Sequence, residues 1–182
     1  MESNRSILAA TQNQNARKTI TDALAEQFTI ETSDSFAESL SKCNARRFEF
    51  IFLDIELLDA SKQTNLREQL YKFWHAVPSV EVIVLCQPDN VRAAVRAVQV
   101  GASDYLTFPL SPTEVRLALE QINENIRLQS ELDYLRDKFW NDESLSLLRT
   151  NSAVMREVFQ KIRSVSQTNS TILLTGESGT GK

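Results

Sequence analysis

Two short runs of apolar residues constrain most strongly how this chain can fold. Residues 48–54 read Phe-Glu-Phe-Ile-Phe-Leu-Asp, and residues 80–86 read Val-Glu-Val-Ile-Val-Leu-Cys. Nearly continuous apolar runs of this length, rich in aromatic and β-branched residues, are typical of parallel strands that are covered on both faces. The sequence therefore predicts a buried sheet with helices packed on both sides.

The segments around these runs predict the rest of that sheet. Weaker strand patterns cover residues 5–10, 28–30 and 103–107. Apolar residues recur at helical spacing in 15–28, 35–44, 65–76 and 88–100, and again from 113 onwards, while Gly101 suits a helix cap. Five strands that alternate with five helices imply an α/β fold with an open parallel sheet and right-handed crossovers.

In such a sheet, functional groups gather beyond the carboxyl ends of the strands. The residues expected there are 11–13, Asp54, 86–87 and 108–109. Asp54 is the only carboxylate that ends one of the buried strands. Its position alone fits two roles: a cap of the following turn, or a nucleophile or metal ligand.

Three stretches then resemble the receiver domain of two-component response regulators: residues 52–55 (Phe-Leu-Asp-Ile), 82–86 (Val-Ile-Val-Leu-Cys) and 100–110 (Val-Gly-Ala-Ser-Asp-Tyr-Leu-Thr-Phe-Pro-Leu). The resemblance covers about residues 4–125, and we assign 1–125 to a receiver-like domain. It implies a flavodoxin-like sheet of strand order 2-1-3-4-5, a cis peptide between Phe108 and Pro109, and a histidine kinase or other signalling partner. It also places Asp54 at the phospho-accepting position.

The chain departs from the receiver pattern at four of the five signature groups. Thr11 and Gln12 stand where the family has two acidic residues that bind Mg²⁺. Cys86 replaces the hydroxyl residue that ends the fourth strand, and Phe108 replaces the lysine before the proline. Only Asp54 remains, so we expect its phosphorylation to be absent or very inefficient, no metal site, and a pocket packed shut by Phe108 and its neighbours.

Electrostatics gives the reason for this expectation. Transfer of a phosphoryl group to a carboxylate brings two negative charges together, and Mg²⁺ and a lysine normally neutralise them. Mg²⁺ prefers charged oxygen ligands, which threonine and glutamine do not supply. An alternative is a phosphorylatable switch in which Glu56 or Asp59 completes an unusual metal site.

A long helix is predicted from residue 113 to about 141. A first apolar stripe should pack on the sheet: Val115, Leu119, Ile122 and Ile126. A second stripe starts two residues later, on nearly the opposite face because two residues rotate a helix by about 200°: Leu128, Leu132, Leu135 and Phe139.

We interpret residues 126–150 as a helical linker, a coiled-coil candidate whose second stripe joins two subunits. The alternative is a helix that lies back on its own domain. The resemblance adds a second dimer face, formed by helix 88–100, strand 103–107 and the helix from 113.

The C-terminal part differs in chemistry from the rest. A helix is predicted over about 152–166 and a strand over 170–175, followed at once by a G-x-x-x-x-G-K motif. This motif is a P-loop, whose backbone N–H groups and lysine bind nucleotide phosphates: Gly176, Glu177, Ser178, Gly179, Thr180, Gly181 and Lys182. The amino-acid sequence of residues 151–182 is similar to the start of the AAA+ ATPase domain of sigma-54-dependent transcriptional activators.

Together these resemblances imply an NtrC-type regulator, in which the receiver and linker control the oligomeric state of an ATPase. ATP and Mg²⁺ would serve the parent protein, and sigma-54 RNA polymerase and DNA would be contacted through domains outside these 182 residues. We expect this chain to carry no catalytic residues and not to hydrolyse ATP. The alternative from another class is a stand-alone nucleotide-binding protein.

Composition supports a cytoplasmic protein. The net charge of −4 argues against a nucleic-acid surface within the chain, and no apolar run is long enough to span a membrane. Cys43 and Cys86 stand in apolar surroundings and are expected to be reduced core thiols. His75 has no second ligand at metal spacing, so we interpret it as a packing or surface residue.

Overall fold

The computed structural model describes residues 5–58, 66–142 and 153–165, together with the single residues 171, 173 and 175. The chain divides into two units, residues 1–129 and 130–182. The first contains a five-stranded sheet of order β2-β1-β3-β4-β5, in which every neighbouring pair is parallel. The predicted α/β fold and its strand order are therefore confirmed.

The two apolar runs form two of the buried strands of the sheet, and β1 is the third. The strands are β1 (Ser6–Ala10), β2 (Thr29–Ser33), β3 (Phe50–Asp54), β4 (Glu81–Cys86) and β5 (Asp104–Thr107). Strand β2 is longer than the predicted 28–30. It lies at the edge of the sheet with two exposed and two half-buried residues, so its continuation carries no apolar run.

Five helices belong to this fold: α1 (Gln14–Leu24), α2 (Phe36–Ala45), α3 (Leu66–Ala76), α4 (Val91–Gln99) and α5 (Pro112–Asp142). Helix α1 ends four residues before the predicted 28, because residues 25–28 turn back into β2. Pro88–Asn90 forms a separate 3-10 turn, η2, so the helix that was predicted from 88 begins only at Val91.

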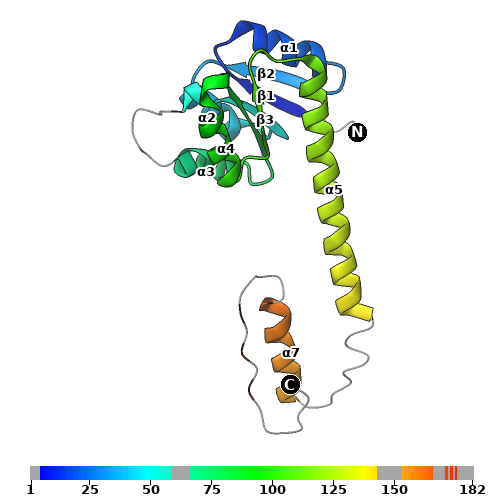
Figure 1. Ribbon diagram of the computed structural model, residues 1–182. Helices are drawn as coiled ribbons and strands as arrows, with labels where there is room; N and C mark the ends of the chain where they lie inside the picture. The colour runs from blue at the N-terminus through cyan, green and yellow to red at the C-terminus, as the bar shows by residue number, and fades with distance from the viewer. Residues whose placement is uncertain are drawn as a thin grey trace. The chain divides into compact units, whose positions relative to one another are not determined.

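Helices cover both faces of the sheet (Figure 1), and alternate residues of the strands contribute to the hydrophobic layer on each face. On one face, α2, α3 and α4 pack on Leu8, Ile51 and Val82. On the other face, α1 and α5 pack on Phe50 and Ile83. Both faces of the sheet are therefore covered, as the apolar runs predicted. The carboxyl ends of β1, β3 and β4 meet at one edge, which carries the candidate site.

Gly101 follows α4 with a φ of 125°, the left-handed region that favours glycine. A Cβ atom there would lie 2.9 Å from Cη2 of Trp74. The predicted cap is therefore confirmed, and the packing of the α3 indole against the backbone adds a second reason for glycine.

Replacing Gly101 with alanine should lower the free energy of unfolding by about 2 kcal/mol, from backbone strain and the contact with Trp74. Chemical denaturation followed by Trp fluorescence measures this loss. The exposed Gln99→Ala, at the end of the same helix, is the matched control and should stay within about 0.5 kcal/mol of the parent. Equal stability of the two variants would contradict the prediction.

Helix α5 is buried on one side near its start and exposed on all sides further along. Val115, Leu119 and Ile122 are buried against the sheet, as predicted. Ile126 was predicted to join them, but it is 43% exposed, so that part of the prediction was wrong. All side chains from 124 to 136 are exposed, because the helix has by then passed the last sheet residue it can cover.

In the second unit, α7 (Ala153–Val165) confirms the predicted helix. The predicted strand 170–175 is not found at its described positions: Thr171, Leu173 and Thr175 have no regular secondary structure, and Leu173 is 85% exposed. A strand requires a hydrogen-bonded neighbour, and no described residue of this unit supplies one. The P-loop residues 176–182 lie outside the described residues.

No described helix has both the length and the apolar character needed to cross a bilayer.

Candidate functional site

Asp54 ends β3 at the carboxyl edge of the sheet, and its side chain is almost fully enclosed, with 5% exposure. One carboxylate oxygen, Oδ2, accepts a hydrogen bond of 2.6 Å from the Thr11 hydroxyl. The other, Oδ1, accepts a bond of 3.1 Å from the backbone N–H of Glu56 and so caps the 3-10 turn η1 (Ile55–Leu57). Both oxygens are therefore engaged by uncharged donors.

Thr11 follows β1 directly and is completely buried. Its hydroxyl also accepts a hydrogen bond of 3.1 Å from the backbone N–H of Asn13, which caps α1. Strands β1 and β3 pair with Ala10 opposite Leu53, so Thr11 and Asp54 are the next residues along each strand. A short side chain at position 11 is thus sufficient to reach the carboxylate.

Among the described residues, no basic side chain pairs with this carboxylate. Gln12 is exposed, and its amide donates to the backbone oxygen of Asp34 at 3.0 Å. Glu56 is also exposed, and Asp59 lies outside the described residues.

The described residues at this edge are a poor match for Mg²⁺. Proteins usually bind this cation through one or two carboxylates together with several waters, and Thr11 supplies only a neutral hydroxyl that is already bonded twice, while Asp54 is enclosed. Within the described ranges, no three His, Cys, Asp or Glu side chains come together as a metal site requires.

Two further positions of the receiver pattern are occupied by buried apolar side chains. Cys86 ends β4 and is fully buried; burial, and secondly the negative charge of Asp54, raise the pKa of its thiol. Phe108 is 7% exposed and packs in the layer formed by α1 and α5. Its backbone N–H donates to the Cys86 carbonyl at 2.9 Å, and the peptide to Pro109 is cis, as the resemblance implied.

The thiols behave as predicted for core residues. Cys43 and Cys86 are both free and buried. Burial raises the pKa of the Cys43 thiol to about 11, so this side chain is protonated at neutral pH.

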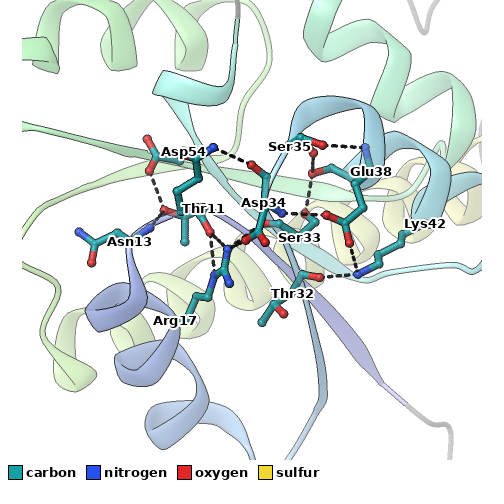
Figure 2. A network of polar contacts seen from close by, with 12 residues as sticks. Thr11, Asn13, Arg17, Thr32, Ser33, Asp34, Ser35, Glu38, Lys42 and Asp54 are labelled. Atoms are coloured by element: carbon teal, nitrogen blue, oxygen red, sulfur yellow. Dashed lines mark hydrogen bonds and ion pairs between the residues drawn. The ribbon is translucent and has the colours of Figure 1, made fainter.

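Arg17 of α1 is the charged residue that organises the neighbourhood (Figure 2). Its guanidinium donates to the carbonyl oxygen of Thr11 at 2.7 Å through Nε, and to that of Ser33 at 3.3 Å. It also forms an ion pair with Asp34, in the loop after β2. Arg17 thus ties the ends of β1 and β2 together beside the Asp54 site.

The same network continues into α2. Ser35 caps this helix by accepting from the N–H of Glu38, whose carboxylate accepts from the N–H of Asp34 at 2.9 Å and pairs with Lys42 at 2.8 Å (Figure 2). Arg17 and Asp34 were not predicted as site residues from the sequence. The Asn13 cap had a local signal, a capping residue before a helix, whereas the Arg17 contacts join segments far apart in sequence.

Comparison with known proteins follows the same division of the chain. Residues 7–120 match the model of the response regulator receiver domain. The chain belongs to the receiver domain family of response regulators. Residues 148–182 match the sigma-54 interaction domain, which confirms the resemblance to NtrC-type sigma-54-dependent regulators.

The chain is similar to curated proteins and to solved structures of longer regulators. The alginate biosynthesis transcriptional regulatory protein AlgB of Pseudomonas putida is 31% identical over 157 residues, covering 86% of this chain and 34% of its own length. The crystal structure of NtrX from Brucella abortus in complex with ADP matches with a TM-score of 0.63 and 25% identity, over 91% of this chain and 35% of that one.

A CheY-like receiver domain protein from Methanospirillum hungatei supports the fold alone, with a TM-score of 0.55 and 22% identity over 71% of this chain and 98% of its own. The chain spans about a third of the length of the curated relatives it matches.

Proposed function

We propose that this chain is the regulatory part of a sigma-54-dependent transcription regulator whose receiver works without a stable aspartyl phosphate. The observation that carries this proposal is the state of Asp54. Its carboxylate is enclosed and held by the Thr11 hydroxyl and the Glu56 N–H, with no cation beside it among the described residues. The carboxylate therefore serves as a structural acceptor that caps η1 and joins β3 to β1.

Phosphorylation would have to overcome three features of the site. The incoming phosphoryl group is negative and meets a carboxylate that no basic side chain of the described residues neutralises. One attacking oxygen would have to give up the 2.6 Å bond from Thr11. At the two remaining receiver positions, Cys86 and Phe108 are buried and uncharged, so neither stabilises a charged product.

Incubation with acetyl phosphate or beryllofluoride, each with Mg²⁺, tests the proposal. We expect no phosphoryl adduct by intact-mass analysis and no change in self-association, in the parent chain and in Asp54→Asn alike. A receiver that carries all five signature groups is the positive control. Saturable modification of the parent that is lost in Asp54→Asn would overturn the proposal and favour the alternative with an unusual metal site.

Thermal melting with Mg²⁺ gives an independent readout, because a ligand that binds only the native state raises the melting temperature. We expect millimolar Mg²⁺ to leave the parent unchanged. The Thr11→Asp, Gln12→Asp variant restores the two carboxylates next to Asp54, and Mg²⁺ should stabilise it. Stabilisation of the parent by Mg²⁺ would contradict the assigned role of Thr11 and Gln12.

The receiver and the linker are also assigned a role in the self-association of the protein. Residues 1–125 form the receiver, 126–150 the linker and 151–182 the first part of an ATPase domain. The exposed leucines of α5 support a homodimer, and the face of α4, β5 and α5 is a second candidate contact. In the parent protein the receiver would set the oligomeric state of the ATPase, which contacts sigma-54 RNA polymerase and DNA in the cytoplasm. A histidine kinase or another protein would supply the signal.

Nucleotide binding is assigned to the same parent protein. The G-x-x-x-x-G-K motif of residues 176–182 and the ADP complex of the related NtrX support ATP with Mg²⁺ as its ligand. Titration of the 182-residue chain with ATP should show weak binding or none. Micromolar affinity would favour the stand-alone nucleotide-binding protein instead.

A further inference from the structure

Arg17 stands where the backbone of its own helix disfavours a positive charge. It is the fourth residue of α1, and the first turn of this helix carries no acidic side chain. The N-terminal turn of a helix has a partial positive charge, so a guanidinium there costs free energy unless acceptors lie close by. Because helical side chains lean toward the N-terminus of their helix, Arg17 is directed back to the end of β1.

Thr11 carries the acceptor that Arg17 reaches. This residue is fully buried, and its carbonyl lies one position beyond the paired part of β1. A buried backbone oxygen needs a hydrogen-bond donor. Two atoms of Arg17 donate to this oxygen, Nε at 2.7 Å and Nη2. The charge of the helix side chain is therefore used to satisfy a strand end.

Thr11 connects this guanidinium to the Asp54 carboxylate. Its N–H donates to the Ser33 carbonyl at 3.1 Å, and that carbonyl also accepts from Arg17 at 3.3 Å. Its hydroxyl accepts from the Asn13 N–H at 3.1 Å and donates to Asp54 at 2.6 Å. Thr11 thus lies between two charged side chains that form no ion pair with each other (Figure 2).

We propose that Arg17 is the positioning residue of the Asp54 site. By holding the Thr11 backbone, it keeps the threonine hydroxyl on the carboxylate and the carboxylate closed to solvent and to phosphodonors. This role rests on the proposed function, in which Asp54 is a structural acceptor, and adds the group that keeps this acceptor engaged. Without Arg17 the buried carbonyl has to reach water, which draws the Thr11 hydroxyl away from Asp54.

The ion pair between Arg17 and Asp34 plays the smaller part. The Asp34 side chain is 68% exposed, whereas that of Arg17 is 22% exposed. Water and salt compete for so exposed a carboxylate, and such pairs contribute little. The donation to the Thr11 carbonyl is buried and escapes this competition. The positioning therefore depends on the contact with Thr11.

Carboxyl labelling tests this role. A water-soluble carbodiimide with glycinamide, followed by peptide mass spectrometry, measures how fast each carboxylate reacts. Asp54 should react slowly in the parent chain, because it is enclosed. Arg17→Gln should speed its labelling about tenfold, the effect of one lost charge-assisted hydrogen bond. Asp22 and Glu26, both exposed, are internal references and should react equally in all variants.

Three further variants separate the contact from the charge. Arg17→Lys keeps a cationic donor and should stay within about threefold of the parent rate. Asp34→Asn removes the ion pair but leaves the contact with the buried carbonyl, so it should stay within about twofold. Arg46→Gln is the matched control, because it removes a similar ion pair, at 2.8 Å to Glu31 of β2, and should leave the rate unchanged.

A double-mutant comparison shows whether Arg17 acts through Thr11. Thr11→Val removes the hydroxyl directly and should also speed the labelling of Asp54 about tenfold. Adding Arg17→Gln to Thr11→Val should then change the rate by less than about twofold, because the hydroxyl that Arg17 places is already gone. Effects that multiply to about 100-fold would show independent action and would overturn the positioning role.

The outcomes keep this role apart from the proposed function. A labelling rate of Asp54 that Arg17→Gln leaves unchanged, or that Asp34→Asn raises as much, overturns the positioning role and leaves the proposed function standing. A phosphoryl adduct on Asp54 of the parent chain overturns both. Circular dichroism checks that each variant is folded, and Arg17→Met, which keeps the aliphatic part of the side chain, replaces Arg17→Gln if that variant unfolds.

Discussion

Replacing Leu132 with aspartate should dissociate the proposed homodimer into monomers at micromolar concentration. Leu132 lies at the centre of the exposed stripe, between Leu128 and Leu135. Each copy would lose a buried leucine worth about 1.5–3 kcal/mol, and a dimer contains two, so the dissociation constant should rise at least about 100-fold. Light scattering or sedimentation over a range of concentrations measures this change.

The stripe offers a close control. Tyr134→Asp introduces the same charge two residues away, at a side chain that is 64% exposed and outside the stripe, and it should leave the mass of the particle in solution unchanged. Because residues 124–136 add nothing to the hydrophobic core, neither variant should alter the stability of the receiver. Identical masses for the parent and Leu132→Asp would contradict the role given to α5.

The fold was largely predictable because its strands are buried on both faces. Strands β3 and β4 could be recognised from composition alone, since parallel strands in the middle of such a sheet admit few polar residues. Strand β2 was less visible because edge strands tolerate polar side chains. The end of α1 was misplaced because the apolar spacing continues to Phe28, which is buried after the helix has ended.

The limits of periodicity also appear in α5. A repeat of apolar residues predicts which face of a helix packs against another element, but it does not predict where the sheet beneath that face ends. Ile122 and Ile126 belong to the same stripe, yet only Ile122 is buried. The sheet boundary, which the spacing cannot encode, decides between them.

At the candidate site, the positions of Asp54 and Thr11 could be predicted because each follows or ends a buried strand. The direct contact between the two side chains could not be predicted, because it depends on side-chain direction. The contacts of Arg17 with Thr11, Ser33 and Asp34 depend on how α1 lies against two strand ends. Such contacts between distant segments leave no local pattern of residue types.

Replacing Thr11 with valine should lower the free energy of unfolding by about 3 kcal/mol, because an enclosed carboxylate then loses its closest donor. Valine has nearly the same shape, so the loss reports the hydroxyl, which bonds Asp54 at 2.6 Å and the Asn13 N–H at 3.1 Å. Chemical denaturation measures it. Thr21→Val, at an exposed position of α1, should change stability by less than about 0.5 kcal/mol.

A double-mutant cycle separates the charge from the packing. In the Asp54→Asn background, Thr11→Val should cost about 1 kcal/mol, because an unpaired neutral amide is less costly to bury than an unpaired carboxylate. Equal losses in both backgrounds would show that the threonine acts through packing or through Asn13 alone. A coupling above about 1 kcal/mol would instead make Thr11 the partner that holds Asp54 in its structural role. That is the bond a phosphoryl group would have to displace.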